Sequence, residues 1–371
     1  MKSVRLYFWL VLGLVLSGSL IFTVFSQTSD LRREGPIWST STPPPGSLTR
    51  DPVIAGMIET MNETHIYNTT DVLQRIPTRL YGTAGNNESA GLLYSKLSGI
   101  PGLQVTYEGG KYNNIIATLP GTDNSAGGIV MVGAHYDSRS TGITDPTARA
   151  PGATDNAGGV AIVVELARVM SQHQFNHTIV FALWNAEEQG MFGSSEYTGI
   201  AASNHVQISL YFNYDSACYD PDNHFILDLM YNSQSAWAEQ MMVQDNTLYS
   251  TNFNLTYNVH NCQADYLSFW DQGYTAVMTH SETHGYAHTP SDTIDKVSTE
   301  YALKNGQLGM AVLAQTAGVR GSVKNPTTLT AAAVSAAVVN QYFTIEGRLM
   351  TSGTALLVTD AAAPADYRRY S

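Results

Sequence analysis

Short runs rich in β-branched and aromatic residues alternate with longer stretches of helical periodicity along the middle of the chain. The predicted strands are Asn114–Leu119, Ile129–Ala134, Thr178–Trp184, Ile208–Tyr214, Phe225–Met230 and Tyr274–Met278. The predicted helices are Ser89–Leu97, Gly158–Met170, Met191–Ser203, Ser235–Tyr249 and Glu300–Val319. Such alternation is typical of a parallel sheet enclosed by helices. We therefore predict an α/β fold, a three-layer sandwich whose central sheet is mixed but mostly parallel, with helices on both faces.

The helix predicted at Gly158–Met170 is apolar on nearly every side, with Val160, Ile162 and Leu166 among its residues. A helix without a polar face belongs in the interior of a protein. Of the 371 residues, 43% are hydrophobic and 13% are charged, which is enough apolar material for a large core. The net charge of −12 provides no basic surface to neutralise phosphates, so we expect no nucleic-acid partner.

Acidic residues and histidines follow the predicted strands directly. His135 and Asp137 follow the second strand, Glu187 and Glu188 the third, and Asp215 the fourth, while Asp155 lies in a glycine-rich segment and His288 lies before the last helix. Ligands bind at the carboxyl ends of strands in such sheets. One acid at a strand end is ordinary, but three strands that end this way indicate a site. Histidine and carboxylate without clustered cysteines favour a catalytic zinc site.

The first 26 residues have the pattern of an export signal, in which two basic residues precede the uncharged apolar stretch 6–26. Residues 1–26 are predicted to be either a cleaved signal peptide or an anchor that spans the membrane, and the sequence leaves both open. In both cases the rest of the chain is extracytoplasmic, secreted or anchored to the membrane. The proline-rich residues 27–50 are predicted to be a flexible tether.

Residues 51–321 are predicted to form the α/β domain, and residues 322–371 a C-terminal appendage of unknown role. Export agrees with potential glycosylation triplets, which begin at Asn62, Asn68, Asn87, Asn176 and Asn254. The two cysteines, Cys218 and Cys262, could form a disulfide in an oxidising compartment, and both are expected to border the site. Two free buried thiols are the alternative.

Five segments carry the site residues in order. They are GAHYDS at 133–138, GATDNAGG at 152–159, NAEEQG at 185–190, YFNYD at 211–215 and AHTPSDT at 287–293. Together they resemble the co-catalytic two-zinc exopeptidases of the secreted leucyl aminopeptidase type. That family also includes glutamate carboxypeptidase, glutaminyl cyclase and the transferrin receptor domain. The resemblance runs from about Pro52 to Ala317.

The resemblance implies two Zn²⁺ per chain and a role for each matching residue. Asp155 would bridge the two metals. His135 and Asp215 would complete the first metal site, and Glu188 and His288 the second.

The resemblance also implies two residues that act beside the metals. Glu187 would be the general base that moves a proton from water to the leaving amine. Asp137 would accept a hydrogen bond from the far ring nitrogen of His135 and so fix its tautomer. Two adjacent zinc ions lower the pKa of water and polarise the scissile carbonyl.

The loop before His288 is predicted to line the pocket. Glu282 and Tyr286 are the candidate substrate contacts in this loop, which also contains His280 and His284. Secreted bacterial aminopeptidases of that family carry an oxyanion-stabilising tyrosine slightly upstream of the position that Ala264–Tyr266 occupy in this sequence. His260 and Asn261 stand in that neighbourhood here, so the oxyanion donor is not assigned.

The implied function is zinc-dependent exopeptidase action on peptides, and we expect an aminopeptidase. An acidic pocket attracts an α-ammonium group and repels a terminal carboxylate. A carboxypeptidase or dipeptidase is the alternative, and Arg139 or Arg149 would then bind the carboxylate. Glutaminyl cyclase is more remote, since Asn156–Gly159 follow the peptidase pattern. An inactive binding domain is equally remote because every expected ligand is present. The sequence does not indicate an oligomeric state.

Overall fold

The computed structural model describes residues 49–108, 110–123, 128–258, 262–282, 285–322, 329–330, 347–351 and 354–358. The predicted signal or anchor at residues 1–26 lies outside the described residues, as do nearly all of the tether and most of the appendage. Within the described ranges, no helix combines the length and hydropathy needed to cross a bilayer.

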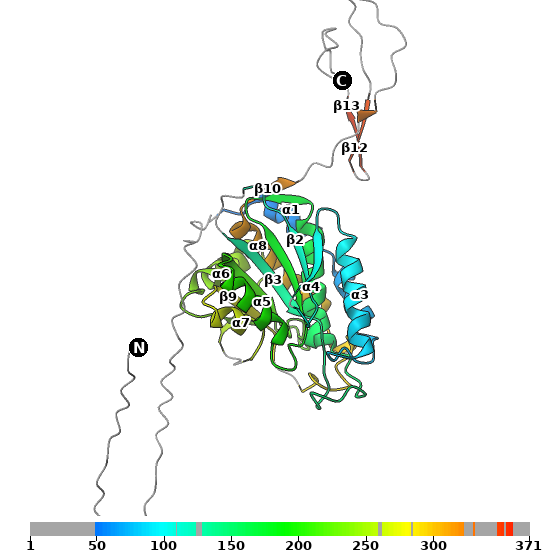
Figure 1. Ribbon diagram of the computed structural model, residues 1–371. Coiled ribbons are helices and arrows are strands. Elements are labelled where there is room, and N and C mark those ends of the chain that lie inside the picture. Colours follow the sequence, from blue (N-terminus) through cyan, green and yellow to red (C-terminus); the bar gives the residue numbers. More distant parts are fainter. Residues whose placement is uncertain are drawn as a thin grey trace, which may run out of the picture. The chain divides into compact units, whose positions relative to one another are not determined.

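The central element of the domain is an eight-stranded sheet with the order β1-β2-β5-β3-β6-β9-β7-β8 (Figure 1). Its strands are β1 (Gln104–Glu108), β2 (Asn114–Leu119), β3 (Ile129–His135), β5 (Ile179–Trp184), β6 (Ile208–Tyr214), β7 (Ile226–Met230), β8 (Asn254–Tyr257) and β9 (Ala276–His280). The neighbours β5, β3, β6 and β9 run parallel, as do β7 and β8. The remaining three pairs are antiparallel. The predicted mixed, mostly parallel sheet is confirmed.

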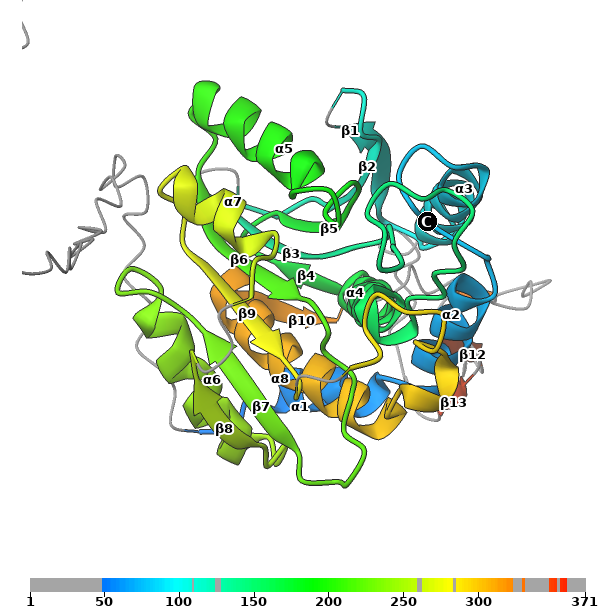
Figure 2. The ribbon, with the colours of Figure 1, turned by 90° about the horizontal axis from the view of Figure 1, so that it is seen from below.

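Helices cover both faces of this sheet (Figure 2). On one face, α4 (Gly158–Met170) and α8 (Thr299–Ala317) pack against the central strands. Around these two helices lie α1 (Pro52–Thr60), α2 (Glu63–Gln74) and α6 (Ala236–Leu248), while α3 (Ala84–Ser98) packs against β1 and β2. The opposite face is covered by α5 (Phe192–Ser203) and α7 (Tyr266–Asp271). The predicted three-layer sandwich is therefore confirmed.

Side chains alternate between the two faces along each central strand, as the strand period of two requires. On β3, Val130 and Val132 enter the larger core beneath α4, whereas Met131 enters the smaller core beneath α7. Every residue of α4 except Arg168 is buried, as its apolar sequence predicts.

Short elements complete the domain. A turn with π-helical hydrogen bonds, η1 (Ala153–Ala157), leads into α4, and a short 3-10 helix, η2 (Ile294–Lys296), precedes α8. The two-stranded ribbon of β4 (His173–Phe175) and β10 (Val319–Ser322) is separate from the main sheet. Outside the domain, within the predicted appendage, a small separate sheet contains β11 (Leu329–Thr330), β12 (Gly347–Thr351) and β13 (Thr354–Val358).

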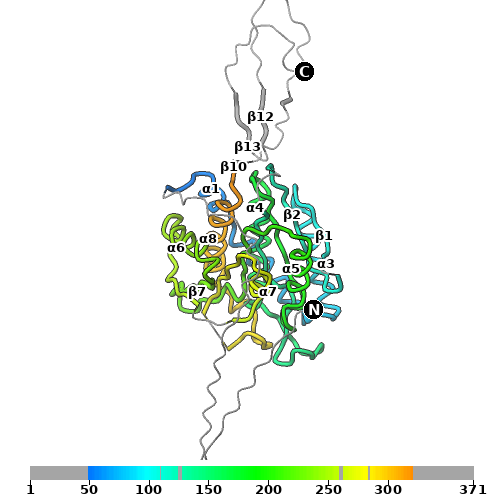
Figure 3. The backbone as a smooth tube through the Cα atoms, turned by 60° about the vertical axis from the view of Figure 1, so that its left-hand side comes forward, coloured from blue at the N-terminus to red at the C-terminus, as the bar shows by residue number. Residues whose placement is uncertain are grey.

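The first and last helices of the domain lie side by side, since α1 packs against α8 and β10 (Figure 3). Asp51 caps α1 by accepting hydrogen bonds from the backbone N–H groups of Val53 and Ile54. This cap and Pro52 at the first helical position start the helix where the sequence indicates it.

Several predicted boundaries differ from the structure, most of all at α3, which begins at Ala84 and not at Ser89. Two of the other differences have clear local reasons. The last helix ends at Ala317, because Gly318 adopts a left-handed conformation (φ 67°) that terminates it, and Val319 begins β10. The last strand begins at Ala276, because Tyr274 closes the turn after α7 by donating a backbone hydrogen bond to Phe269.

Gly133 on β3 tests how tightly the layer beneath the site is packed. A Cβ there would come within 2.8 Å of Ala182 O and Trp184 Nε1 and within 2.9 Å of Tyr211 Oη. We expect Gly133→Ala to lower the free energy of unfolding by about 1–3 kcal/mol. Gly91 on α3 has open space where its Cβ would stand, with no atom within 4 Å, so Gly91→Ala should raise it by about 0.5–1 kcal/mol.

Chemical denaturation of the parent chain and both variants measures these changes. Equal stability of Gly133→Ala and the parent would contradict the close packing between β3, β5 and β6.

Candidate metal centre

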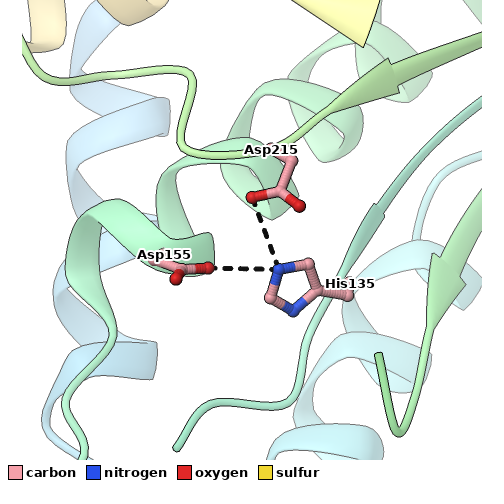
Figure 4. A group of neighbouring side chains, drawn as sticks. All are labelled: His135, Asp155 and Asp215. Carbon is pink, nitrogen blue, oxygen red and sulfur yellow. Dashed lines mark ion pairs between the residues drawn. The ribbon is translucent and has the colours of Figure 1, made fainter. Parts of the chain in front are cut away.

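The end of β3, the segments that follow β5 and β6, the turn η1 and the loop before η2 bring two groups of metal-ligating side chains together. The first group contains His135 at the end of β3, Asp155 in η1 and Asp215 directly after β6, with ligand atoms all within 4.8 Å of one another (Figure 4). His135 Nε2 lies 3.2 Å from Asp155 Oδ1 and 3.6 Å from Asp215 Oδ1. All three residues are more than nine-tenths buried.

The second group shares Asp155 with the first and adds Glu188 and His288. His288 Nε2 lies 3.0 Å from Asp155 Oδ2 and 3.1 Å from Glu188 Oε2. Asp155 thus presents Oδ1 to His135 and Oδ2 to His288. A carboxylate in this position can bridge two cations.

The donor atoms fit metal ions better than they fit one another. His135 Nε2 is buried and forms no hydrogen bond despite its close carboxylate neighbours, and the buried Glu188 Oε1 also has no hydrogen-bond partner. Burial raises the pKa of Glu188 to about 7, and the charge on Asp155 adds to the shift. Imidazole and carboxylate are zinc ligands. Two cations would pair the orphaned atoms and offset the repulsion.

Glu187 lies beside both groups without belonging to either. Its side chain is 9% exposed and lines the same pocket, with Oε2 3.9 Å from His135 Nε2. Burial raises the pKa of Glu187 well above its usual value, and the charge on Asp215 adds to this. A carboxylate that is close to the metal ligands but free of them suits general-base chemistry.

Asp137 has a different partner from the one predicted. His135 Nδ1 lies 3.2 Å from the backbone oxygen of Asp137, whereas the Asp137 carboxylate is 3.6 Å away, beyond hydrogen-bond distance. The carboxylate instead accepts hydrogen bonds from the backbone N–H groups of Glu187 and Glu188, each at 3.2 Å. The Asp137 side chain points past the imidazole of His135 toward the turn that carries Glu187 and Glu188. Its two hydrogen bonds hold the backbone of that turn in place.

Asp292 holds the turn that carries Asp155, a role that the sequence did not reveal. Its Oδ1 accepts hydrogen bonds from Thr154 N at 2.9 Å and Thr154 Oγ1 at 2.7 Å, and its Oδ2 accepts one from Asp155 N at 3.1 Å. The only sequence signal was its place in the segment 287–293, four residues after His288.

Arg79 lies behind the site and is completely buried. Its guanidinium donates to four backbone oxygens, those of Leu73, Tyr136, Pro151 and Gly152. Burial lowers the pKa of Arg79 to about 10, while the charges of Asp292 and Asp137 oppose the shift. The guanidinium therefore remains charged at neutral pH and partly balances the carboxylates. No pattern in the sequence singles it out.

Four of the five candidate ligands, Asp155, Glu188, Asp215 and His288, line a pocket of about 360 Å³. Besides these four ligands and Glu187, the pocket wall includes Arg139, Gly190, Met191, Ser216, Cys262, Gln263, His280 and Ala287. The predicted substrate contacts Glu282 and Tyr286 are not part of this wall, and Tyr286 is 37% exposed. His260, Asn261 and His284 lie outside the described residues.

The disulfide predicted between Cys218 and Cys262 is not formed, and both cysteines are free. The Cys218 side chain is fully buried and packs under the start of α4, where its Sγ occupies the space that a Cβ on Gly158 would need. Cys262 lies in the pocket wall. The two thiols occupy different places, which the spacing in sequence could not reveal.

The sequence profile of peptidase family M28 matches residues 114–313, more than half of the chain. The chain belongs to peptidase family M28. This match covers all five segments that carry the ligand groups, and the M28 assignment confirms the resemblance from which their roles were inferred.

Similar proteins agree with the M28 assignment. A probable zinc metalloprotease of Leptosphaeria maculans is 37% identical over 105 residues, which cover 28% of this chain and 24% of that protein. This chain therefore matches about a quarter of the length of that relative.

Solved structures share the fold. The LapA aminopeptidase of Legionella pneumophila superposes with a TM-score of 0.65 at 18% identity, covering 75% of this chain and 78% of that one. The glutaminyl cyclase of Fimbriiglobus ruber gives a TM-score of 0.59 at 16% identity, covering 74% and 99%. At these identities the likeness establishes the fold of the M28 domain and not its activity.

The two acids of the turn after β5 should behave differently when they are changed. We expect Glu187→Gln to lower turnover by about 10² to 10⁴-fold with unchanged metal content, because Glu187 is outside both ligand groups. Glu188→Gln should instead reduce metal content, because Glu188 belongs to the second group. Elemental analysis and a peptide hydrolysis assay measure both effects. Metal loss in Glu187→Gln with retention in Glu188→Gln would reverse the two assignments.

Proposed function

We propose that this M28 chain is a two-zinc aminopeptidase that removes single residues from the amino end of peptides. The observation that carries the proposal is the pair of ligand groups that share Asp155, with Glu187 beside them and outside both. The proposal includes export of the chain by residues 1–26, which remain a sequence-based expectation.

The residues of the pocket divide the work of peptide hydrolysis. His135, Asp155 and Asp215 would hold one zinc, and Asp155, Glu188 and His288 the other. Two zinc ions held there would supply Lewis acidity, polarising the scissile carbonyl and acidifying water.

Glu187 is placed to take a proton from the attacking water and to deliver it to the leaving amine nitrogen. Asp137 keeps the backbone of Glu187 and Glu188 in place for this transfer through its two hydrogen bonds. Asp292 does the same for the backbone of Asp155. Positioned acids of this kind do not have to reorganise during the reaction.

The negative charge of the pocket favours entry of the amino end of a peptide. Carboxylates dominate the wall, and Arg139 is the cation among the described residues that line it. Arg139 Nε donates to Glu188 Oε2 at 2.8 Å, so its charge is already engaged. Arg149, the other candidate for binding a terminal carboxylate, is exposed and outside the pocket wall. An α-ammonium group fits this environment better than a carboxylate does.

The number of metals tests the co-catalytic arrangement. We expect elemental analysis of the zinc-loaded chain to find two zinc ions per chain. Asp215→Ala should lose one ion and most of the activity, because Asp215 serves the first group alone. One ion per chain, with activity unaffected by Asp215→Ala, would indicate a single-metal site of the glutaminyl cyclase kind.

The direction of cleavage tests the choice of chain end. One peptide is incubated in three forms, unblocked, N-acetylated and C-amidated, and the products are followed by mass spectrometry. We expect acetylation to stop hydrolysis and amidation to leave it unchanged, because the pocket receives the α-amino group. The opposite pattern would make the chain a carboxypeptidase with Arg139 as the carboxylate anchor.

A further inference from the structure

Three aromatic side chains form a partly exposed row beside the pocket. Tyr81, Tyr112 and Phe192, here called the aromatic row, come from the segment before α3, the turn between β1 and β2, and the start of α5. Ring centroids lie 5.5 Å apart for Tyr81 and Tyr112 and 5.7 Å apart for Tyr112 and Phe192. Phe192 is 45% exposed, and the two tyrosines are half-buried. Neighbouring aromatic rings that are exposed to solvent are candidates for an interaction site.

The aromatic row begins at the wall of the pocket. Gly190 and Met191 line the pocket and directly precede Phe192. Two atoms of the Phe192 ring lie 3.5 and 3.6 Å from the position that a Cβ on Gly190 would take. In Figure 2 the start of α5 lies near the edge of the sheet that carries β1 and β2. A molecule that leaves the pocket over Gly190 therefore meets the row.

Partly buried hydrogen bonds link the aromatic row to the strand ends that carry the metal ligands. Asn185 Nδ2 donates to the backbone oxygen of Tyr112 at 2.7 Å, and Tyr136 Oη donates to that of Asn113 at 3.1 Å. Asn185 lies two residues before Glu187, and Tyr136 directly follows His135. Tyr81 Oη donates to the backbone oxygen of Lys111 at 3.2 Å. The row is thus preorganised relative to the site, which lowers the entropic cost of binding.

The proposed chemistry determines which part of a substrate passes over the row. Glu187 must come within hydrogen-bond reach of the leaving amine nitrogen. The peptide downstream of the cleaved bond therefore leaves the pocket beside the turn that runs from Glu187 to Phe192. An extended chain advances about 3.3 Å per residue, so three rings at these spacings span roughly three residues.

We propose that the aromatic row extends the substrate site and binds roughly three residues downstream of the cleaved bond, with a preference for apolar or aromatic side chains. This inference rests on the proposed function for its direction. With one residue upstream of the cleaved bond and roughly three downstream, peptides of about four residues or more should bind better than dipeptides.

The experiment measures binding without turnover. The full chain with Glu187→Gln, loaded with zinc, is titrated with peptides of two, four and six residues that share their first two residues. One series continues with Leu and Phe, and the other with Gly and Ser. We expect affinity for the apolar series to rise about tenfold from two to six residues, equivalent to about 1.4 kcal/mol, and the Gly/Ser series to rise much less.

Adding Tyr112→Ala or Phe192→Ala should remove most of this gain with length. Both changes truncate a ring and retain the backbone oxygen of Tyr112 that accepts from Asn185. The matched control is Tyr257→Ala, a tyrosine that is 45% exposed on β8 at the opposite edge of the sheet. The Tyr257→Ala variant should keep the full gain in affinity with peptide length. So should Tyr286→Ala, which removes the ring that packs beside Tyr219.

The proposal is overturned if affinity does not rise with length, if both series rise equally, or if the gain survives removal of both rings. If only Tyr286→Ala lost the gain in affinity with peptide length, the downstream residues would bind beside Tyr219 and Tyr286 and not on the aromatic row. Because binding is read without hydrolysis, failure of the parent chain to cleave unblocked peptides counts against the proposed function and not against the row.

Discussion

Carboxylate charge buried at one end of the central sheet is the constraint on which the rest of this structure depends. Among the described residues there, the acids less than 10% exposed include Asp137, Asp155, Glu187, Asp215, Asp265 and Asp292. An isolated charge cannot be buried without donors, counter-ions or protonation. The carboxylates of Asp137 and Asp292 accept hydrogen bonds from backbone N–H groups. The fully buried guanidinium of Arg79 supplies a positive charge near these acids. Asp155 and Asp215 belong to the first ligand group, where a metal ion would balance their charge.

This distribution makes the site a product of the whole domain. The Asp155 turn is held by Asp292, which lies 137 residues further along the chain, and the Glu188 turn is held by Asp137. Two of the candidate ligands therefore have their backbone fixed by an acid from another segment. No single strand and loop could present these ligands alone, because the partner carboxylates arrive only when β3, β5 and the segment before α8 are in place.

Site residues could be predicted from the sequence where the residue type and the position at a strand end point to the same role. They could not be predicted where contacts between distant segments determine the role. His135 and Asp215 were predictable because parallel strands end at the same edge of a sheet. Arg79 was not, since its partners are backbone oxygens from distant segments. The disulfide prediction was wrong because nearness to the site does not specify a side-chain direction. Edge strands such as β1, whose residues are mostly exposed, lack the apolar runs that identified the central strands.

The same buried charge couples metal binding to folding. Burial raises the pKa of Glu188 and of Asp265 to about 7 in the folded chain without metal. When burial raises the pKa of an acid, the acid is protonated in both the folded and the unfolded chain at low pH, and it then costs no stability. As the pH rises from the unfolded pKa to the folded pKa, the free energy of unfolding falls. The metal-free domain is therefore disfavoured near neutral pH, where these acids ionise. Cations that require ionised ligands bind best under that condition. Of these two acids, Glu188 belongs to the second ligand group, so the ionised form that disfavours the fold near neutral pH is also the form that binds a metal ion.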